Sequence, residues 1–281
     1  MATIVLALAR ALQLPTPGAR GRSRAIPRRS MRIRSSARTD VGRHRRANED
    51  AFFRDDELRL YVVADGMGGH AAGEVASAEA VETVYGMVKR GLPALGDCEE
   101  PLTQERARGV CRLIEGAIQA ATYMVYAIAE LDRDKSGMGT TISVALVVGG
   151  ALVTGQVGDS RIYQVRGGQA VQMTEDHTLI AWQIKNGLIS ADEARLSPHR
   201  NVITRAVGNR DYVEVDTSIV SVEAGDRYLL CSDGLHGYLR SEEEIAGIAA
   251  RGGDVAVDMF IELANRRGGR DNITAVLVEV L

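Results

Sequence analysis

Paired glycines between short β-rich segments are the feature that most constrains the fold of this chain. Gly149-Gly150 and Gly167-Gly168 each separate two segments rich in β-branched and apolar residues, which cover 141–148, 151–157, 161–165 and 169–173. Segments of this composition favour strands. A loop of two glycines joins antiparallel strands, whereas a parallel crossover needs about a dozen residues or more. The middle of the chain therefore predicts antiparallel sheet.

Helical periodicity flanks this region on both sides. Apolar residues recur at spacings of three and four residues, which predicts helices at 74–89, 103–132, 179–196, 241–250 and 255–266. The third of these is more polar and is interrupted at Asn186-Gly187. Ser241, with Glu244 three residues later, predicts a capping box. Further strands are predicted at 58–64, 212–220, 227–231 and 273–281. Helices layered around antiparallel sheet predict one α+β domain.

Charge is distributed unevenly along the chain. Residues 1–39 hold nine Arg, no Lys and no acidic residue, and the remaining 25 basic and 37 acidic residues give a formal charge of −12. An acidic domain argues against nucleic-acid binding, and no apolar run reaches the length of a membrane helix. We expect residues 1–37 to be a disordered basic leader and 38–281 to be the domain. A transit peptide, or a true start at Met31, stays open for the leader.

Three cysteines have no paired spacing; they are Cys98, Cys111 and Cys231. Isolated cysteines argue against disulfides and zinc, and they predict a reducing compartment, the cytoplasm. Cys231 lies inside an apolar run, where packing is its expected role.

Five short acidic segments are the main functional signal; they cover 48–50, 65–70, 158–161, 232–234 and 270–272. In four of them a carboxylate adjoins a glycine, follows an apolar run, or both. Carboxylates that gather at strand ends repel one another unless a hard cation neutralises them. The oxygens of Glu49, Asp65, Asp233 and Asp271 favour Mg²⁺ or Mn²⁺ over Zn²⁺. Gly66 has no Cβ, so its carbonyl can approach a cation closely.

One of these segments also matches a dinucleotide-binding motif. Residues 66–71 fit the pattern G-x-G-x-x-[GA] between a predicted strand and a predicted helix. Asp65 precedes the first glycine, where its charge would oppose a pyrophosphate. No acidic residue ends a second parallel strand about 20 residues further on. An oxidoreductase that binds a dinucleotide is therefore the weaker hypothesis.

The acidic segments belong to a longer series of motifs. In order along the chain these cover 39–50 (TDVGRHRRANED), 65–70 (DGMGGH), 137–141 (GMGTT), 157–161 (VGDSR), 201–205 (NVITR), 231–235 (CSDGL) and 271–274 (DNIT). The series resembles the metal-dependent protein Ser/Thr phosphatases, the PP2C or PPM family, in its bacterial form. The resemblance covers about residues 38–281. It implies a fold in which two antiparallel sheets form a sandwich flanked by helix pairs.

The resemblance also implies a metal site. Asp65 matches the residue that bridges two ions, Mn²⁺ or Mg²⁺. Asp233 and Asp271 match the remaining ligands of the first ion. Glu49 and the carbonyl of Gly66 match those of the second.

Other residues match family positions around this site. Arg45 matches the arginine that binds the substrate phosphate, and Asp50 matches an acceptor for a water on the metal. Asp159 matches a ligand of a weaker third ion, although a turn residue paired with Arg161 is an equal alternative. Residues 178–198, called the flap below, match a mobile segment beside the active site. Trp182 is expected to anchor the flap by its apolar bulk.

The activity that the resemblance implies is hydrolysis of phosphoserine and phosphothreonine in proteins. A water activated between two cations attacks phosphorus in line, without a covalent phosphoenzyme. The general acid stays open: animal relatives place a His where this chain has Met67, so His70 or a metal-bound water is the candidate. Implied partners are phosphoproteins and a bacterial Ser/Thr kinase, and we expect a monomer. The alternative is a catalytically silent member that acts as a regulatory binding module.

Overall fold

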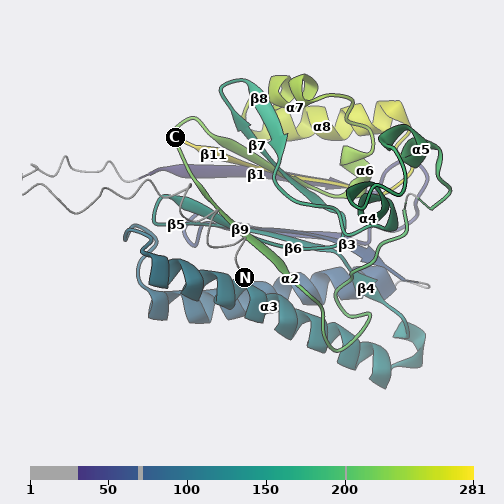
Figure 1. Cartoon of the computed structure of the whole chain (residues 1–281), viewed down its shortest axis with the longest axis horizontal. Coiled ribbons are helices and arrows are strands. Elements are labelled where there is room, and N and C mark those ends of the chain that lie inside the picture. The colour runs from purple at the N-terminus through teal and green to yellow at the C-terminus, as the bar shows by residue number, and fades with distance from the viewer. Residues whose placement is uncertain (1–30, 69–71, 200) are drawn as a thin grey trace, which may run out of the picture.

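Two antiparallel sheets lie face to face in the computed structural model, which describes residues 31–68, 72–199 and 201–281 (Figure 1). One sheet has the strand order β1-β11-β10-β7-β8; its strands are β1 (Ile33–Asp40), β7 (Arg161–Arg166), β8 (Gln169–Gln172), β10 (Arg227–Cys231) and β11 (Ile273–Val280). The other has the order β2-β3-β5-β6-β9, with β4 paired to β3; its strands are β2 (Asp50–Asp55), β3 (Leu60–Met67), β4 (Gly139–Thr140), β5 (Ile142–Val148), β6 (Ala151–Val157) and β9 (Asp216–Ser221). Every strand pair among the described residues is antiparallel, which excludes the doubly wound parallel sheet of a dinucleotide-binding domain there.

Helices cover the two outer faces of this sandwich (Figure 1). The long helices α2 (Ala72–Gly91) and α3 (Gln104–Leu131) pack on the sheet that contains β3, and α7 (Glu242–Ala249) and α8 (Gly253–Arg267) pack on the sheet that contains β11. Three short helices, α4 (Leu179–Lys185), α5 (Ala191–Leu196) and α6 (Asp233–His236), lie near one end of the sandwich, and two 3₁₀ helices, η1 (Leu92–Leu95) and η2 (Arg133–Lys135), flank α3. None of the helices in the described ranges is both long and apolar enough to cross a membrane.

Three apolar clusters hold these layers together. The central cluster fills the space between the sheets with side chains such as Tyr61, Leu152 and Tyr228, all fully buried. The other two lie between each sheet and its helices. Strands β5, β6 and β11 are buried along their whole length because both of their faces meet a cluster. These strands therefore read as nearly continuous apolar runs.

The structure confirms the predicted antiparallel α+β sandwich and most of its elements. The two glycine-pair hairpins form, and both Gly149 and Gly150 have positive φ, as such loops require. The flap contains two helices, α4 and α5, separated around the Asn186-Gly187 interruption. Ser241 caps α7 by accepting from the Glu244 amide, but the Glu244 carboxylate accepts from the amide of Arg240, so the expected capping box is only half formed.

Three expectations about element positions were wrong. The strand predicted at 212–220 begins at Asp216, because residues 212–215 form a loop over α3 instead. Strands β1 and β2 were missed, since both are rich in polar residues and lie at sheet edges. Residues 33–37, which were assigned to the leader, belong to β1 and pair with β11. Residues 1–30 lie outside the described part of the chain.

Candidate metal centre

Strand pairing brings the acidic segments to one end of the sandwich. Asp50 begins β2 and pairs directly with Asp65 near the end of β3. Cys231, the last residue of β10, pairs with the first residue of β7, so Asp233 and Asp159 emerge at the same end. Asp271 lies just before β11, which runs antiparallel to β10. In antiparallel sheets the end of one strand adjoins the start of its neighbour, which explains how residues more than 200 positions apart meet.

A cleft of about 310 Å³ at this end contains almost all of the expected site. The expected residues that line it are Arg45, Glu49, Asp65, Gly66, Asp159, Asp233 and Asp271. Met67, Gly68, Thr141, Asn201 and Ile203 complete its walls. All five lie in the motifs or the Gly-rich turn recognised in the sequence, but none of them was assigned a role there. His70 lies outside the described residues.

Asp50 lies behind the cleft and does not line it. Its Oδ2 accepts hydrogen bonds from Ser232 Oγ, at 2.7 Å, and from Thr274 Oγ1, at 2.6 Å. Its Oδ1 is buried and has no hydrogen-bond partner among the described residues. A buried carboxylate oxygen without a donor is costly, and one that faces a metal site can accept from a water there.

Close backbone packing explains the glycine in the cleft wall. A Cβ at Gly66 would lie 2.1 Å from the Gly73 carbonyl oxygen and 2.4 Å from that of Glu49. Only glycine therefore allows β3 to pack against the segment that carries Glu49. The Gly66 amide donates to the Glu49 carbonyl, and the Asp65 amide donates to Thr141 Oγ1. These bonds hold the backbone on both sides of the candidate ligands.

Asn272 holds the loop that contains Arg45. Its side chain is almost fully buried and uses both donors and its acceptor. Nδ2 donates to the carbonyls of Val41 and Ala47, and Oδ1 accepts from the Glu49 amide at 2.8 Å. No role for this side chain was predicted from the sequence. Its position next to Asp271 at the start of β11 was the only sequence signal available.

Burial and mutual repulsion raise the pKa values of the clustered carboxylates. Burial, followed by the charge of Asp50, raises the pKa of Asp65 well above its usual value. Burial, then the charge of Asp233, raises the pKa of Asp159 to about 7. Burial also raises the pKa of Asp50 to about 7, against the hydrogen bonds from Thr274 and Ser232. A cation in the cleft would relieve this repulsion.

The oxygen ligands of the cleft fit hard divalent cations, although the carboxylates do not already surround one common point. No three His, Cys, Asp or Glu side chains in the described ranges stand as a ready ion site. Arg45 separates two of the acids, because its guanidinium lies 2.8 Å from Asp271 Oδ2 and 3.8 Å from Glu49 Oε2. All the acids nevertheless line one cleft. Oxygen ligands alone favour Mg²⁺ or Mn²⁺.

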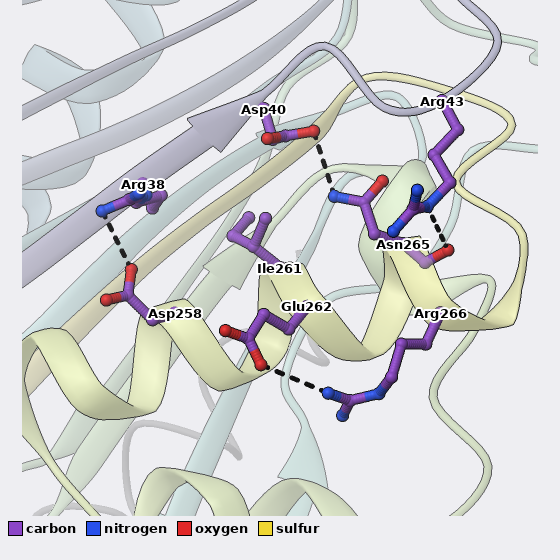
Figure 2. Close-up of a pocket in the computed structure, with 8 residues that line it drawn as sticks. All are labelled: Arg38, Asp40, Arg43, Asp258, Ile261, Glu262, Asn265 and Arg266. Carbon is purple, nitrogen blue, oxygen red and sulfur yellow. Dashed lines mark hydrogen bonds and ion pairs between the residues drawn. The ribbon is translucent and has the colours of Figure 1, made fainter.

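Arg43, on the same loop as Arg45, turns away from this cleft. Its backbone amide donates to the Gly269 carbonyl, and its Nε donates to the Asn265 carbonyl at the end of α8. Figure 2 shows it beside a second pocket, of about 400 Å³, where Arg38 pairs with Asp258 and Arg266 with Glu262. Arg43 therefore ties the loop to α8, a contact that the sequence alone did not predict.

Asp159 does not form the salt bridge that was its alternative role. Arg161 instead pairs with Asp176 through hydrogen bonds of 2.6, 2.9 and 3.2 Å. Burial lowers the pKa of His236 to about 3, so its neutral ring donates from Nε2 to the Asp159 carbonyl. Asp159 is thus free to direct its carboxylate into the cleft that it lines.

The family model described as Protein phosphatase 2C matches residues 42–281. This chain belongs to the protein phosphatase 2C family. The serine/threonine phosphatase stp of Listeria welshimeri is 40% identical over 247 residues, which cover 86% of this chain and 94% of that protein. The solved structure of the Mycobacterium tuberculosis phosphatase PstP is similar, with a TM-score of 0.77, 35% identity, and coverage of 88% of this chain and 98% of that one.

A further structure bears on the metal centre of this protein phosphatase 2C member. The catalytic domain of PstP, in complex with two manganese ions, has a TM-score of 0.76 and 34% identity to this chain. The match covers 90% of this chain and all of that domain. The chain is therefore a metal-dependent Ser/Thr phosphatase of the bacterial type, in agreement with the oxygen ligands of its cleft.

Proposed function

We propose that this phosphatase hydrolyses phosphoserine and phosphothreonine in proteins with two divalent cations held by the cleft acids. The convergence of Glu49, Asp65, Asp233 and Asp271 on one cleft is the observation that carries the proposal. Asp65 serves both ions, Asp233 and Asp271 complete the first site, and Glu49 with the Gly66 carbonyl completes the second. Asp159 provides a ligand for a weaker third ion. Mn²⁺ and Mg²⁺ both suit these oxygens.

When bound, the cations supply a water of lowered pKa as nucleophile and positive charge opposite the phosphoryl oxygens. Arg45 binds the phosphoryl group through its planar guanidinium, which matches two oxygens at once. Asp50 accepts a hydrogen bond from the attacking water through its unpaired Oδ1 and so orients that water. Asn272 keeps the loop of Arg45 against β11.

The intact set of acids supports an enzyme over the silent binding module. A module without activity has no need for four carboxylates around one cleft, since their mutual repulsion destabilises the fold. The proposed partners are phosphoproteins and a bacterial Ser/Thr kinase whose products this chain dephosphorylates. We also propose a monomer in the cytoplasm. The three free cysteines, Cys98, Cys111 and Cys231, suit a reducing compartment.

Phosphate release from a phosphothreonine peptide tests the proposed chemistry. Activity should require Mn²⁺ or Mg²⁺ and should stop when EDTA is added. Asp233→Asn should lower kcat by at least about 100-fold, because loss of an electrostatic group at a reacting centre costs about that much. Glu262→Gln, on the exposed face of α8, is the matched control and should keep full activity. Metal-independent hydrolysis, or an active Asp233→Asn protein with an intact fold, would refute the proposal.

A further inference from the structure

A second cleft adjoins the candidate metal centre. It has a volume of about 280 Å³ and is lined in part by residues of α4, in the flap, and of α6. Both helices lie near one end of the sandwich (Figure 1). Asp159, Asn201 and Asp233 line both clefts, so the two lie next to each other. We call this second space the flap cleft.

One wall of the flap cleft is apolar. Ile180, Ala181 and Ile184 of α4 line it, at a spacing that places them on one face of the helix. Ile184 is 41% exposed, whereas Ile180 is only 9% exposed and fixes the helix to the domain. The flap cleft therefore presents aliphatic surface that no other described residue covers.

The charged groups of the flap cleft are already paired or belong to the metal centre. Arg161 is held by Asp176 through a bidentate ion pair, and Asp176 also accepts from Gln172 Nε2. Asp159 and Asp233 lie at its boundary with the metal centre. A charged side chain that entered the flap cleft would lose its hydration without gaining a free counter-charge. An apolar side chain would only replace water on aliphatic surface.

We propose that the flap cleft is a substrate subsite, which takes an apolar side chain close in sequence to the phosphorylated residue. The inference rests on the proposed function, because the phosphoryl group must lie in the adjoining metal centre. An extended peptide advances about 3.3 Å per residue and points alternate side chains to opposite sides. A neighbouring residue of the substrate thus reaches the flap cleft while the phosphate stays at Arg45.

The size of the flap cleft supports a side chain as its occupant. Sites for drug-sized ligands begin at roughly 300 Å³, and a volume of about 280 Å³ lies just below that range. A leucine, methionine or phenylalanine of a phosphoprotein therefore fits better than a cofactor. Selectivity would come from Ile180, Ala181 and Ile184.

A peptide series tests this subsite. Phosphothreonine peptides carry serine at every flanking position, and leucine then replaces serine at one position at a time, from three residues before to three residues after. The kcat/KM for phosphate release with Mn²⁺ is measured for each peptide. One flanking position should favour leucine by about tenfold or more, the discrimination expected of a small apolar pocket.

Two substitutions in α4 then assign the preference to the flap cleft. Ile184→Ser removes exposed aliphatic surface, and Ala181→Phe fills the space from the same face. Both substitutions should reduce the leucine preference to less than about twofold. Hydrolysis of p-nitrophenyl phosphate and circular dichroism, measured for each protein, check the active site and the fold. Trp182→Ser is the matched control, because Trp182 lies on the same helix, is 53% exposed and does not line the cleft.

The outcomes separate this subsite from the proposed function. Equal kcat/KM values across the series, or a leucine preference that survives in either folded variant, would overturn the subsite and leave the phosphatase intact. Loss of the preference in Trp182→Ser as well would also overturn it. Failure of the unchanged protein to hydrolyse any peptide or p-nitrophenyl phosphate would refute the proposed function and the subsite together.

Discussion

Arg45 combines exposure with charge in a way that suits substrate capture. Its side chain is 47% exposed, and its guanidinium contacts Asp271 and Glu49 at the rim of the cleft. Exposed ion pairs contribute little to stability. Arg45 is therefore dispensable for the fold, and its remaining N–H donors can meet a phosphoryl group.

We predict that Arg45→Ala raises KM roughly tenfold or more and changes kcat little, because a charge-assisted hydrogen bond to bound substrate is worth about 1.5–3 kcal/mol. Steady-state kinetics with a phosphothreonine peptide measures both constants. Arg46→Ala, an exposed neighbour, should leave both unchanged. A loss confined to kcat would instead place Arg45 in the chemical step.

Asn272 illustrates a residue whose role depends on tertiary contacts. We predict that Asn272→Ala lowers the free energy of unfolding by about 2–3 kcal/mol, because it leaves buried amide and carbonyl groups of the Arg45 loop unpaired. Urea unfolding measures the change. Asn186→Ala, at the exposed end of α4, should cost less than about 0.5 kcal/mol. Equal, small effects at both positions would show that the loop is held by other contacts.

The candidate metal ligands were largely predictable at the residue scale, whereas their supports were not. Asp65, Asp233 and Asp271 each follow or precede an apolar run beside a turn, and that context marks a strand end in the sequence itself. The roles of Asn272 and Thr141 arise only when β11 and β5 are placed beside the segments that carry Glu49 and Asp65. The Arg161–Asp176 pair likewise joins residues from opposite sides of the β7–β8 hairpin. Local sequence gives no sign of it.

At the scale of elements, polar contacts fasten the two segments that flank the flap to the sandwich. Asp216, the first residue of β9, accepts from His177 Nε2 at 3.0 Å and from Arg205 at 2.7 Å. His177 in turn accepts from the Gly158 amide through Nδ1, which places its proton on Nε2. Trp182, expected to anchor the flap, is instead more than half exposed, and Ile180 supplies the buried contact.

These contacts predict a dependence of stability on pH. The hydrogen bond from His177 leads the causes that lower the pKa of Asp216 to about 2, from an unfolded value near 3.8. A carboxyl whose pKa is depressed by folding stabilises the fold above its unfolded pKa, and this contribution is lost as pH falls through the folded value. We therefore predict that Asp216→Asn destabilises the protein at pH 7 and that the difference shrinks between about pH 4 and pH 2.

Urea unfolding of both proteins across this pH range measures the difference. Glu214→Gln is the matched control, because Glu214 also pairs with Arg205 but is 71% exposed. It should have little effect at any pH. A difference between Asp216→Asn and the unchanged protein that stays constant from pH 7 to pH 2 would show that the carboxylate charge does not hold the segments on either side of the flap.

The sequence predicted the boundaries of strands correctly where a strand is completely buried. It missed strands that are only partly buried. Strands β5, β6 and β11 are buried throughout, so their apolar runs matched the observed strands within a residue or two. Strand β1 is largely polar and was missed. It is stabilised by pairing with β11, a contact between the two ends of the domain that no local pattern reveals.

At the scale of the whole molecule, the antiparallel sandwich explains why the site lies where it does. Short hairpin loops in the sequence predicted that the strands pair antiparallel. They did not show which strands share a sheet. That arrangement depends on long-range pairs such as β1 with β11 and β10 with β7. These pairs gather strand ends and their carboxylates around one cleft, with the helix layers on the two outer faces (Figure 1).

Isothermal titration of the metal-free protein with Mn²⁺ tests most directly whether these carboxylates share cations. We predict two tightly bound ions per chain, apart from the weaker third ion, for the unchanged protein and for Glu262→Gln. Asp65→Asn, which keeps the size of the side chain but removes its charge, should abolish both binding events or weaken each at least 100-fold while the fold stays intact by circular dichroism. Two ions bound by Asp65→Asn with unchanged affinity would contradict the account, because Asp65 could not then serve both sites.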